Sequence, residues 1–296
     1  MNKYLLAGIS ALAKTKSRFN YPWFFGHSGA SVLAGYFLLR DNDLPDEVRN
    51  AIAKHLDQIV AGDDALFSPV SYDSPQADQK EFIQFLSECV RVHSTTGHGV
   101  IFGALVLKAV TIEPCLFTKE VSDGVVSLLR DCLDDVPNRH YGIADYHSPD
   151  VDYSGIKILT SAKEAAGYSL SVHDVVYPDQ TIGNTYYFLA GDLLHSVTYA
   201  HALLELEELG YGEIVSEGLD AISRHIFLSS RTHQDLEPIQ TVQLYDPRTI
   251  SFWDRSLSEP HQIKLAYSSL ALTTSSTAEE RARVFGTLSK YWASYK

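Results

Sequence analysis

The sequence predicts an all-α fold made of repeated antiparallel helical hairpins, and three observations support this prediction. Four segments rich in Ala, Gly, Ser and Leu have the pattern of helices buried on all sides. After each comes a break and then a more charged, amphipathic helical pattern, which is typical of a helix with one side in solvent. Strand patterns are few, and "VVYP" and "TVQLY" are short. We therefore expect an α/α toroid-like array with an inner and an outer layer of helices.

The first element is expected at the N-terminus, where "MNKYLLAGISALAKTK" imitates a signal peptide. Its apolar run is short and is broken by Gly8 and Ser10, which disfavours a secretory signal. We expect a first amphipathic helix here instead.

Four inner helices follow, and each is expected to begin close to a histidine. Their segments are "FFGHSGASVLAGYFLL", "TTGHGVIFGALVLKAV", "DLLHSVTYAHALLEL" and "EPHQIKLAYSSLAL", with the histidines at His27, His98, His195 and His261. Their amphipathic outer partners are expected over residues 44–60, 117–133, 211–227 and 278–292. An inner and an outer helix therefore alternate four times along the chain.

The spacing of these histidines, 71, 97 and 66 residues, is too irregular for a strict solenoid. Two inserts account for it, at about residues 136–184 and 232–260. Long excursions on a helical scaffold are often lids or pocket walls, and ordinary surface connections are the alternative for each. We expect residues 1–296 to form a single domain that includes both inserts.

The composition favours a soluble protein that acts on small molecules. The formal net charge is -13, which disfavours nucleic acid or an anionic membrane as partner because those ligands need clustered Lys and Arg. No apolar run is expected to reach the length that spans a bilayer. The 3 cysteines are widely spaced and form no C-x-x-C pair, so they predict neither disulfides nor a thiolate zinc site and indicate a reducing cytoplasm.

The four histidines of the inner helices form the first candidate site. Inner helices of a closed array point equivalent ends toward one mouth, so the four imidazoles are expected to converge. A single histidine on an apolar helix is more often a satisfied core residue than a ligand. Burying four imidazoles without partners is costly, however, and one metal ion would satisfy them together. Imidazole suits Fe, Cu, Zn, Ni and Co, so the ligand type alone does not name the ion.

"HQIKLAYSS" places Lys264 one helical turn after His261, on the same face. The equivalent residues of the other segments are Ala30, Ile101 and Thr198, which indicates an interior position. An ammonium beside a metal in an apolar interior is unfavourable, so the pKa of this lysine is expected to fall. A neutral amine can react with carbon dioxide to form a carbamate, an anionic oxygen ligand. An ion pair with a nearby carboxylate and a snorkelling side chain remain the alternatives.

At these residues the sequence resembles the questin oxidase-like family. The similarity lies in "GHSGAS", "TTGHGVIFGALVL", "HSVTYAHALL" and especially "HQIKLAYSS", from about residue 20 to residue 275. The resemblance implies a helical non-haem Fe(II)-dependent oxygenase, a mono- or dioxygenase that uses dioxygen on an aromatic phenol or quinone-type molecule. Ring cleavage or a Baeyer-Villiger-like oxidation is the implied reaction. This chain is shorter than the fungal members, so its substrate need not be theirs.

The resemblance also implies the iron ligands. In the family four histidines and a carboxylated lysine hold the metal, and the matching residues are His27, His98, His195, His261 and Lys264. The carbamate would donate negative charge that four neutral imidazoles cannot, which gives Lys264 a catalytic role as well as a ligand role.

Three further residues of the inner helices are candidates for contact with the substrate. Tyr199 and Tyr267 follow the proposed ligands His195 and His261 by four and six residues. His201 lies six residues after His195 and off its face, which favours a core or pocket position over a fifth imidazole ligand.

The first insert contains a second set of candidates, namely His140, Tyr141, Asp145, Tyr146 and His147. A substrate phenol could find hydrogen-bond partners there, with His140 and Tyr141 as binding residues and His147 as a catalytic base. A solvated loop is the alternative.

Two other kinds of function remain open. A metal-dependent hydrolase or lyase would use the same ligands, with zinc or another divalent ion, to activate water. A non-catalytic helical-repeat binding protein would keep the histidines for structure. No phosphate-cradling glycine loop, dinucleotide fingerprint or serine nucleophile elbow occurs in the sequence, so nicotinamide and flavin cofactors are not expected.

Overall fold

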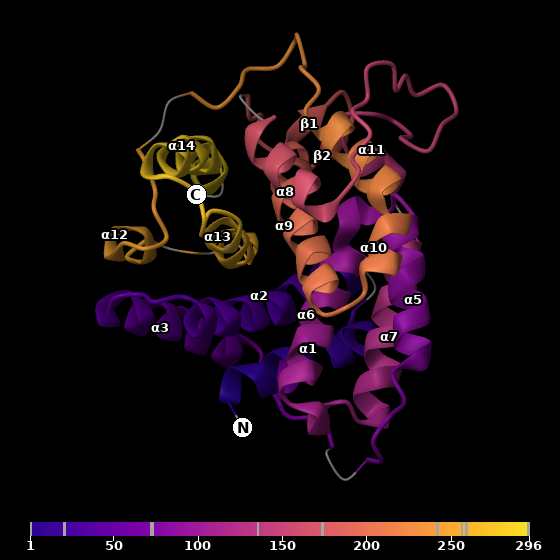
Figure 1. The fold of residues 1–296 in the computed structure, drawn as a ribbon, viewed down its shortest axis with the longest axis vertical. Coiled ribbons are helices and arrows are strands. Elements are labelled where there is room, and N and C mark those ends of the chain that lie inside the picture. The colour runs from indigo at the N-terminus through magenta and orange to yellow at the C-terminus, as the bar shows by residue number, and fades with distance from the viewer. Residues whose placement is uncertain are drawn as a thin grey trace.

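The computed structural model describes residues 2–19, 22–71, 74–134, 136–172, 175–240, 243–255, 257 and 260–294. Helices dominate this part of the chain, and the strands in it form one two-stranded sheet (Figure 1). The prediction of an all-α fold is therefore confirmed. One continuous hydrophobic cluster runs through most of the helices and forms the main core.

The four inner helices correspond to the histidine segments. They are α2 (Pro22–Asp41), α6 (His98–Ile112), α9 (Leu189–Glu208) and α13 (His261–Leu272). Most of their residues are buried, because small and aliphatic side chains let other elements pack on every side. Each inner helix packs against two others, in the cyclic order α2, α6, α9, α13. This order brings residues from all four helices to one centre.

Small residues allow α1 (Lys3–Arg18) to pack closely against α2. A Cβ on Gly29 of α2 would lie 3.0 Å from the carbonyl oxygen of Gly8 in α1. The two backbones approach this closely because neither residue has a side chain. The "GHSGAS" segment is therefore shaped by helix packing as well as by its histidine.

The N-terminal segment is a helix, as the sequence predicts. The side chain of Asn2 caps α1 by accepting a hydrogen bond from the backbone N–H of Tyr4. Most residues of α1 are buried, and the helix packs against α2 and against α7 (Lys119–Leu133).

The outer helices follow the amphipathic patterns. They are α3 (Asp46–Gly62), α7, α10 (Gly212–Glu217), α11 (Leu219–Ser229) and α14 (Ala278–Ser294), with α4 (Asp64–Phe67) and α5 (Lys80–Arg91) beside them. The pattern predicts one helix over residues 211–227, but the chain forms two, which meet at Gly218. The close approach of Val90 requires a glycine here, since a Cβ on Gly218 would lie 2.5 Å from the carbonyl oxygen of Val90, and a glycine inside a helix weakens it.

Helix α6 and the turn before it, Thr95–Ile112, are apolar and long enough to cross a bilayer by length and composition. The expectation that no run reaches this length is therefore wrong. Of this segment, 83% is buried inside the protein, as is usual for a core helix of a soluble protein.

The two inserts contain short elements that the sequence patterns do not reveal. The first insert contains α8 (Ala162–Ser171) and β1 (Gln180–Ile182), and β1 pairs antiparallel with β2 (Thr185–Tyr187). Gly183, with a φ angle of +60°, lies in the tight turn between the strands. The second insert contains α12 (Ile250–Trp253). "VVYP" forms no strand, and residues 241 and 242 of "TVQLY" lie outside the described residues.

Three short 3-10 helices complete the described elements. They are η1 (Thr95–Gly97), η2 (Pro114–Leu116) and η3 (Pro137–Arg139). Of these, η1 directly precedes His98 and shapes the candidate site.

Candidate metal centre

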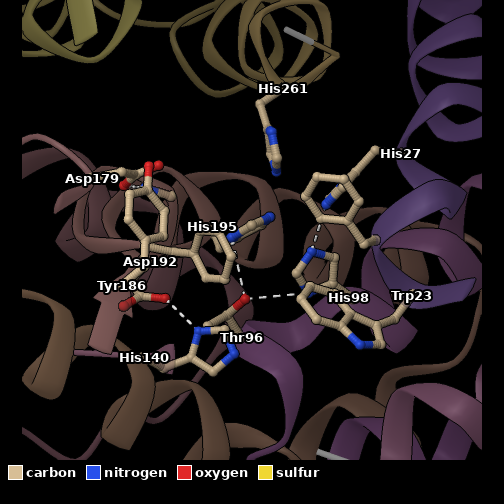
Figure 2. Close-up of a pocket in the computed structure, with 13 residues that line it drawn as sticks. Trp23, His27, Thr96, His98, His140, Asp179, Tyr186, Asp192, His195 and His261 are labelled. Atoms are coloured by element: carbon tan, nitrogen blue, oxygen red, sulfur yellow. Dashed lines mark hydrogen bonds and ion pairs between the residues drawn. The ribbon is translucent and has the colours of Figure 1, made fainter. Parts of the chain in front are cut away.

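The four histidines meet at the centre of the inner helices, as the sequence predicts (Figure 2). Neighbouring ring centroids are 4.6 Å apart for His27 and His98, 4.3 Å for His98 and His195, 5.0 Å for His195 and His261, and 3.9 Å for His261 and His27. One ligand atom from each ring can be chosen so that all four lie within 4.8 Å of one another. All four side chains are buried.

The N-terminal parts of the four inner helices carry these rings. His98 and His261 are the first residues of α6 and α13, whereas His27 and His195 lie in the second turns of α2 and α9. Ser31 of α2 fixes the start of α13, because its hydroxyl donates a hydrogen bond to the carbonyl oxygen of Pro260.

The turn before α6 positions two of the imidazoles. Thr95, Thr96 and Gly97 have φ angles of 43°, 53° and 84°. This left-handed conformation is rare for β-branched residues and costs about 1–3 kcal/mol at each of the two threonines. The turn places two hydrogen-bond acceptors, one from Thr95 and one from Thr96, next to the histidine cluster. The carbonyl oxygen of Thr95 accepts a hydrogen bond from Nδ1 of His98, and Oγ1 of Thr96 lies 3.2 Å from Nδ1 of both His98 and His195.

These contacts define which imidazole nitrogens are basic. The Thr96 hydroxyl donates its own proton to the carbonyl oxygen of Thr95 at 2.7 Å, so it accepts hydrogen bonds from the imidazoles. Nδ1 of His98 and of His195 therefore carry the protons, which leaves Nε2 of each ring as the ligand atom. Nε2 of His195 is buried and has no hydrogen-bond partner among the described residues.

Three of the imidazoles are held in the neutral form that binds metals. Burial, followed by the charges of the other imidazoles and of Lys264, lowers the pKa of His27, His98 and His195 well below the usual 6.5. Nε2 of His27 and Nε2 of His98 are 2.9 Å apart. Two nitrogens about 2.0–2.1 Å from one ion have this separation when they subtend about a right angle. The donor set therefore fits a transition-metal ion.

Lys264 lies against the histidine cluster. Its side chain is buried, with 2% of the residue exposed, so the snorkelling alternative is wrong. Nζ contacts Nδ1 of His27 and lies 5.8 Å from the centre of the Phe102 ring. The equivalent residues of the other inner helices are buried as well, which confirms the interior position.

A cavity of about 330 Å³ opens beside the cluster, and all four histidines line it. Its other walls are aromatic, from Trp23, Phe24, Tyr186 and Phe188, and polar, from Thr96, His140, Asp179 and Asp192. Cavities of this size accept small organic ligands, and aromatic walls with a few polar groups are typical of such sites. The first insert supplies part of the wall, which fits the expectation that it forms a pocket side.

His140 and Asp192 form a buried pair in this wall. Nδ1 of His140 lies 2.8 Å from Oδ1 of Asp192, and Oδ2 of Asp192 lies 2.5 Å from the backbone N–H of Tyr141, which donates to it. A carboxylate on Nδ1 fixes the tautomer of an imidazole and increases the basicity of Nε2. His140, predicted to bind substrate, therefore lines the cavity with a carboxylate partner.

Tyr141 and His147 lie elsewhere. The Tyr141 hydroxyl is shared between Nε2 of His93, at 2.8 Å, and Nδ1 of His225, at 2.7 Å. His147 is exposed at a separate surface hollow beside Tyr146. Neither is among the described residues that line the histidine cavity. His147 therefore lines a different hollow from the histidine cluster.

The remaining predicted substrate residues also lie outside this cavity. Tyr199 is buried, and its hydroxyl donates a hydrogen bond to the carbonyl oxygen of Val90 at 3.4 Å. His201 and Tyr267 line two other hollows, toward the C-terminal ends of the inner helices.

Sequence reasoning assigns no role to several cavity residues. Asp192 lies three residues before His195 on the same helix, a spacing that places both side chains on one face. Thr96 stands two residues before His98. Oδ1 of Asp179 accepts hydrogen bonds from the backbone N–H groups of Ala190, at 2.8 Å, and Gly191, at 3.2 Å, so this carboxylate caps α9 at the edge of the cavity.

Comparison with known proteins gives no match, whether with family models, with curated proteins or with solved structures. The chemistry of the site is therefore the basis for a functional proposal.

Proposed function

We propose that the protein is a non-haem Fe(II)-dependent oxygenase of the questin oxidase-like type, acting with dioxygen on an aromatic phenol or quinone-type small molecule. The observation that carries this proposal is the set of four buried imidazoles in the wall of a cavity of about 330 Å³. A structural zinc site is normally closed to small molecules, whereas this cluster faces a space that can hold a substrate.

His27, His98, His195 and His261 would hold the iron, with Lys264 as a carbamate adding an anionic oxygen ligand. Iron bound there would supply dioxygen activation, which amino-acid side chains do not perform alone. The hydrogen bonds that His98 and His195 donate to Thr95 and Thr96 keep these two imidazoles in the correct tautomer and orientation. These bonds are in place without any movement of the chain.

The other cavity walls would hold the substrate. Trp23 and Phe188 offer apolar faces to a flat ring. The His140 and Asp192 pair would accept the proton of a phenol hydroxyl, with the proton moving to Nε2 of His140 while Asp192 stabilises the resulting imidazolium. Loss of that proton makes the ring more electron-rich and therefore easier to oxidise.

The proposal extends to the architecture and the compartment. The cyclic packing of the inner helices supports an α/α toroid-like array of four hairpin pseudo-repeats, in which four equivalent positions supply the ligands. Among the described residues, no disulfide joins Cys89, Cys115 or Cys132, which supports a reducing cytoplasm as the location.

Elemental analysis tests the metal. Purified protein is loaded anaerobically with Fe(II) in bicarbonate, beside the variants His261→Ala and His55→Ala. His55 is a matched control because its ring contacts the carbonyl oxygen of Trp253, away from the cluster. We expect about one iron per chain in the wild type and in the control, and its loss in His261→Ala.

Oxygen consumption tests the reaction. The iron-loaded protein should consume dioxygen when quinols or polycyclic phenols are added, and the zinc-loaded protein should not. Tight zinc binding with oxygen-independent hydrolysis would support the hydrolase alternative instead. Absence of stoichiometric metal in the wild type would contradict the proposal and leave a binding protein.

A further inference from the structure

A second polar cluster lies at the opposite ends of the inner helices from the histidines. Nζ of Lys108, in α6, lies 2.6 Å from Oε1 of Glu205, in α9, and 2.8 Å from Oδ2 of Asp41, in α2. The hydroxyl of Tyr267, in α13, donates a hydrogen bond to the same oxygen of Glu205. Each inner helix thus contributes to this group, called the rear cluster below.

The rear cluster is open to solvent. A surface hollow of about 410 Å³ is lined by Asp41, Lys108, His201, Glu205 and Tyr267, among others. The side chains of Asp41 and Lys108 are 31% and 20% exposed, whereas that of Glu205 is 6% exposed. The cluster therefore becomes more buried from the surface toward the helix centre.

A small void continues from the rear cluster to Lys264. His201, Glu205 and Tyr267 line both the surface hollow and this void, and Lys264 lines the void as well. Its volume is about 10 Å³, which is the space of about one water molecule. Ala34 and Ala202 give the void apolar walls, which suit a small uncharged molecule.

The front cavity offers Lys264 no comparable access. Lys264 is not among the described residues that line that cavity, and its Nζ contacts Nδ1 of His27, which is one of the cavity's wall residues. Any metal or substrate in front would block the approach further. The rear void therefore reaches this lysine, whereas the front cavity does not.

We propose that the rear cluster and the void form the entry route for carbon dioxide to Lys264, separate from the substrate cavity. The inference rests on the proposed function, in which this lysine becomes a carbamate. The neutral amine nitrogen forms one N–C bond, one C=O electron pair moves to oxygen, and one proton leaves the nitrogen. The hydrogen-bonded groups of the rear cluster give that proton a path to solvent.

Cyanate provides a test that needs neither metal nor activity. Isocyanic acid is a linear triatomic molecule like carbon dioxide, and its carbon takes the lysine nitrogen while one proton passes from that nitrogen to its own. The product is stable and is found by peptide mass spectrometry. The labelling rate of Lys264 in metal-free protein is divided by that of the exposed Lys163, which serves as an internal standard.

Three variants distinguish entry through the rear void from entry through the front cavity. Tyr267→Ala widens the rear route, Ala202→Val narrows the void, and Phe188→Ala widens the front cavity. We expect the labelling ratio to rise about tenfold in Tyr267→Ala, as when opening becomes about 1.4 kcal/mol easier. It should fall in Ala202→Val and stay within about twofold in Phe188→Ala. Circular dichroism checks that each variant is folded, and Ala202→Val alone carries the test if Tyr267→Ala is not.

Two outcomes would overturn the route. One is faster labelling in Phe188→Ala with no change in the two rear variants. The other is absence of label on Lys264 in every protein while Lys163 reacts fully. Failure of the wild type to bind iron would contradict the proposed function, but it would leave the cyanate result for the route unchanged.

Discussion

Replacing Thr96 by valine should weaken metal binding without changing the fold. Valine keeps the β-branched shape but removes the hydroxyl that accepts a hydrogen bond from Nδ1 of His195. His98 retains the carbonyl oxygen of Thr95 as its acceptor, so the main loss falls on one ring. A buried donor left without its acceptor costs about 1–3 kcal/mol. This cost matches the 10- to 100-fold loss, about 1.4–2.8 kcal/mol, that is usual when a group supporting a metal ligand is removed.

The assay is competition between the protein and a chelating dye for Fe(II), performed without oxygen. Thr96→Ser keeps the hydroxyl and should bind iron nearly as the wild type does. Thr15→Val is a matched control, because Thr15 is also buried and donates to the carbonyl oxygen of Ala11 at 2.7 Å, far from the site. Thr96→Val with an affinity within about twofold of the wild type would refute the role given to this hydroxyl.

Three other predictions follow. Metal-free protein should lose stability as the pH falls below about 6.5, because unfolding lets His27, His98 and His195, whose pKa values are lowered in the folded protein, take up protons. A melting temperature that stays constant from about pH 7.5 to pH 5.5 would contradict this. In carbon-labelled bicarbonate the wild type should show a carbamate carbon resonance by NMR. The resonance should be absent in Lys264→Met and present in the control Lys54→Met. A signal that survives in Lys264→Met belongs to another amine. Gly97→Ala should lower the melting temperature more than Gly155→Ala. Both glycines have φ above +80°, but only at Gly97 would the new Cβ lie 2.5 Å from the Tyr199 ring. Equal decreases would show that the contact with Tyr199 does not contribute to the loss of stability.

The central part of the site was predictable from the sequence because it repeats. Four small-residue helices each carry a histidine near the start, and inner helices bring equivalent positions together. The interior position of Lys264 followed from the small or apolar residues at its equivalents. Such an inference needs only helix periodicity and the inner or outer character of each helix.

Contacts between distant segments were not predictable. Thr96 and His195 are 99 residues apart, and His140 and Asp192 are 52 apart. Their meeting depends on a left-handed turn and on how the first insert folds back, and neither has a periodic pattern. Tyr267 illustrates another reason. Six residues along a helix move a side chain by about 9 Å along the axis, which places Tyr267 at the rear cluster instead of beside the four histidines.

The convergence of the N-terminal parts of the inner helices has an electrostatic consequence. Each helix has a partial positive charge of about one half at its N-terminus, and all four N-terminal parts converge on the histidines. The backbone alone therefore gives this site a positive potential. Such a field repels a bare cation and attracts anions. An anionic ligand on Lys264 and a deprotonated phenol would therefore each make the site more favourable for a divalent metal.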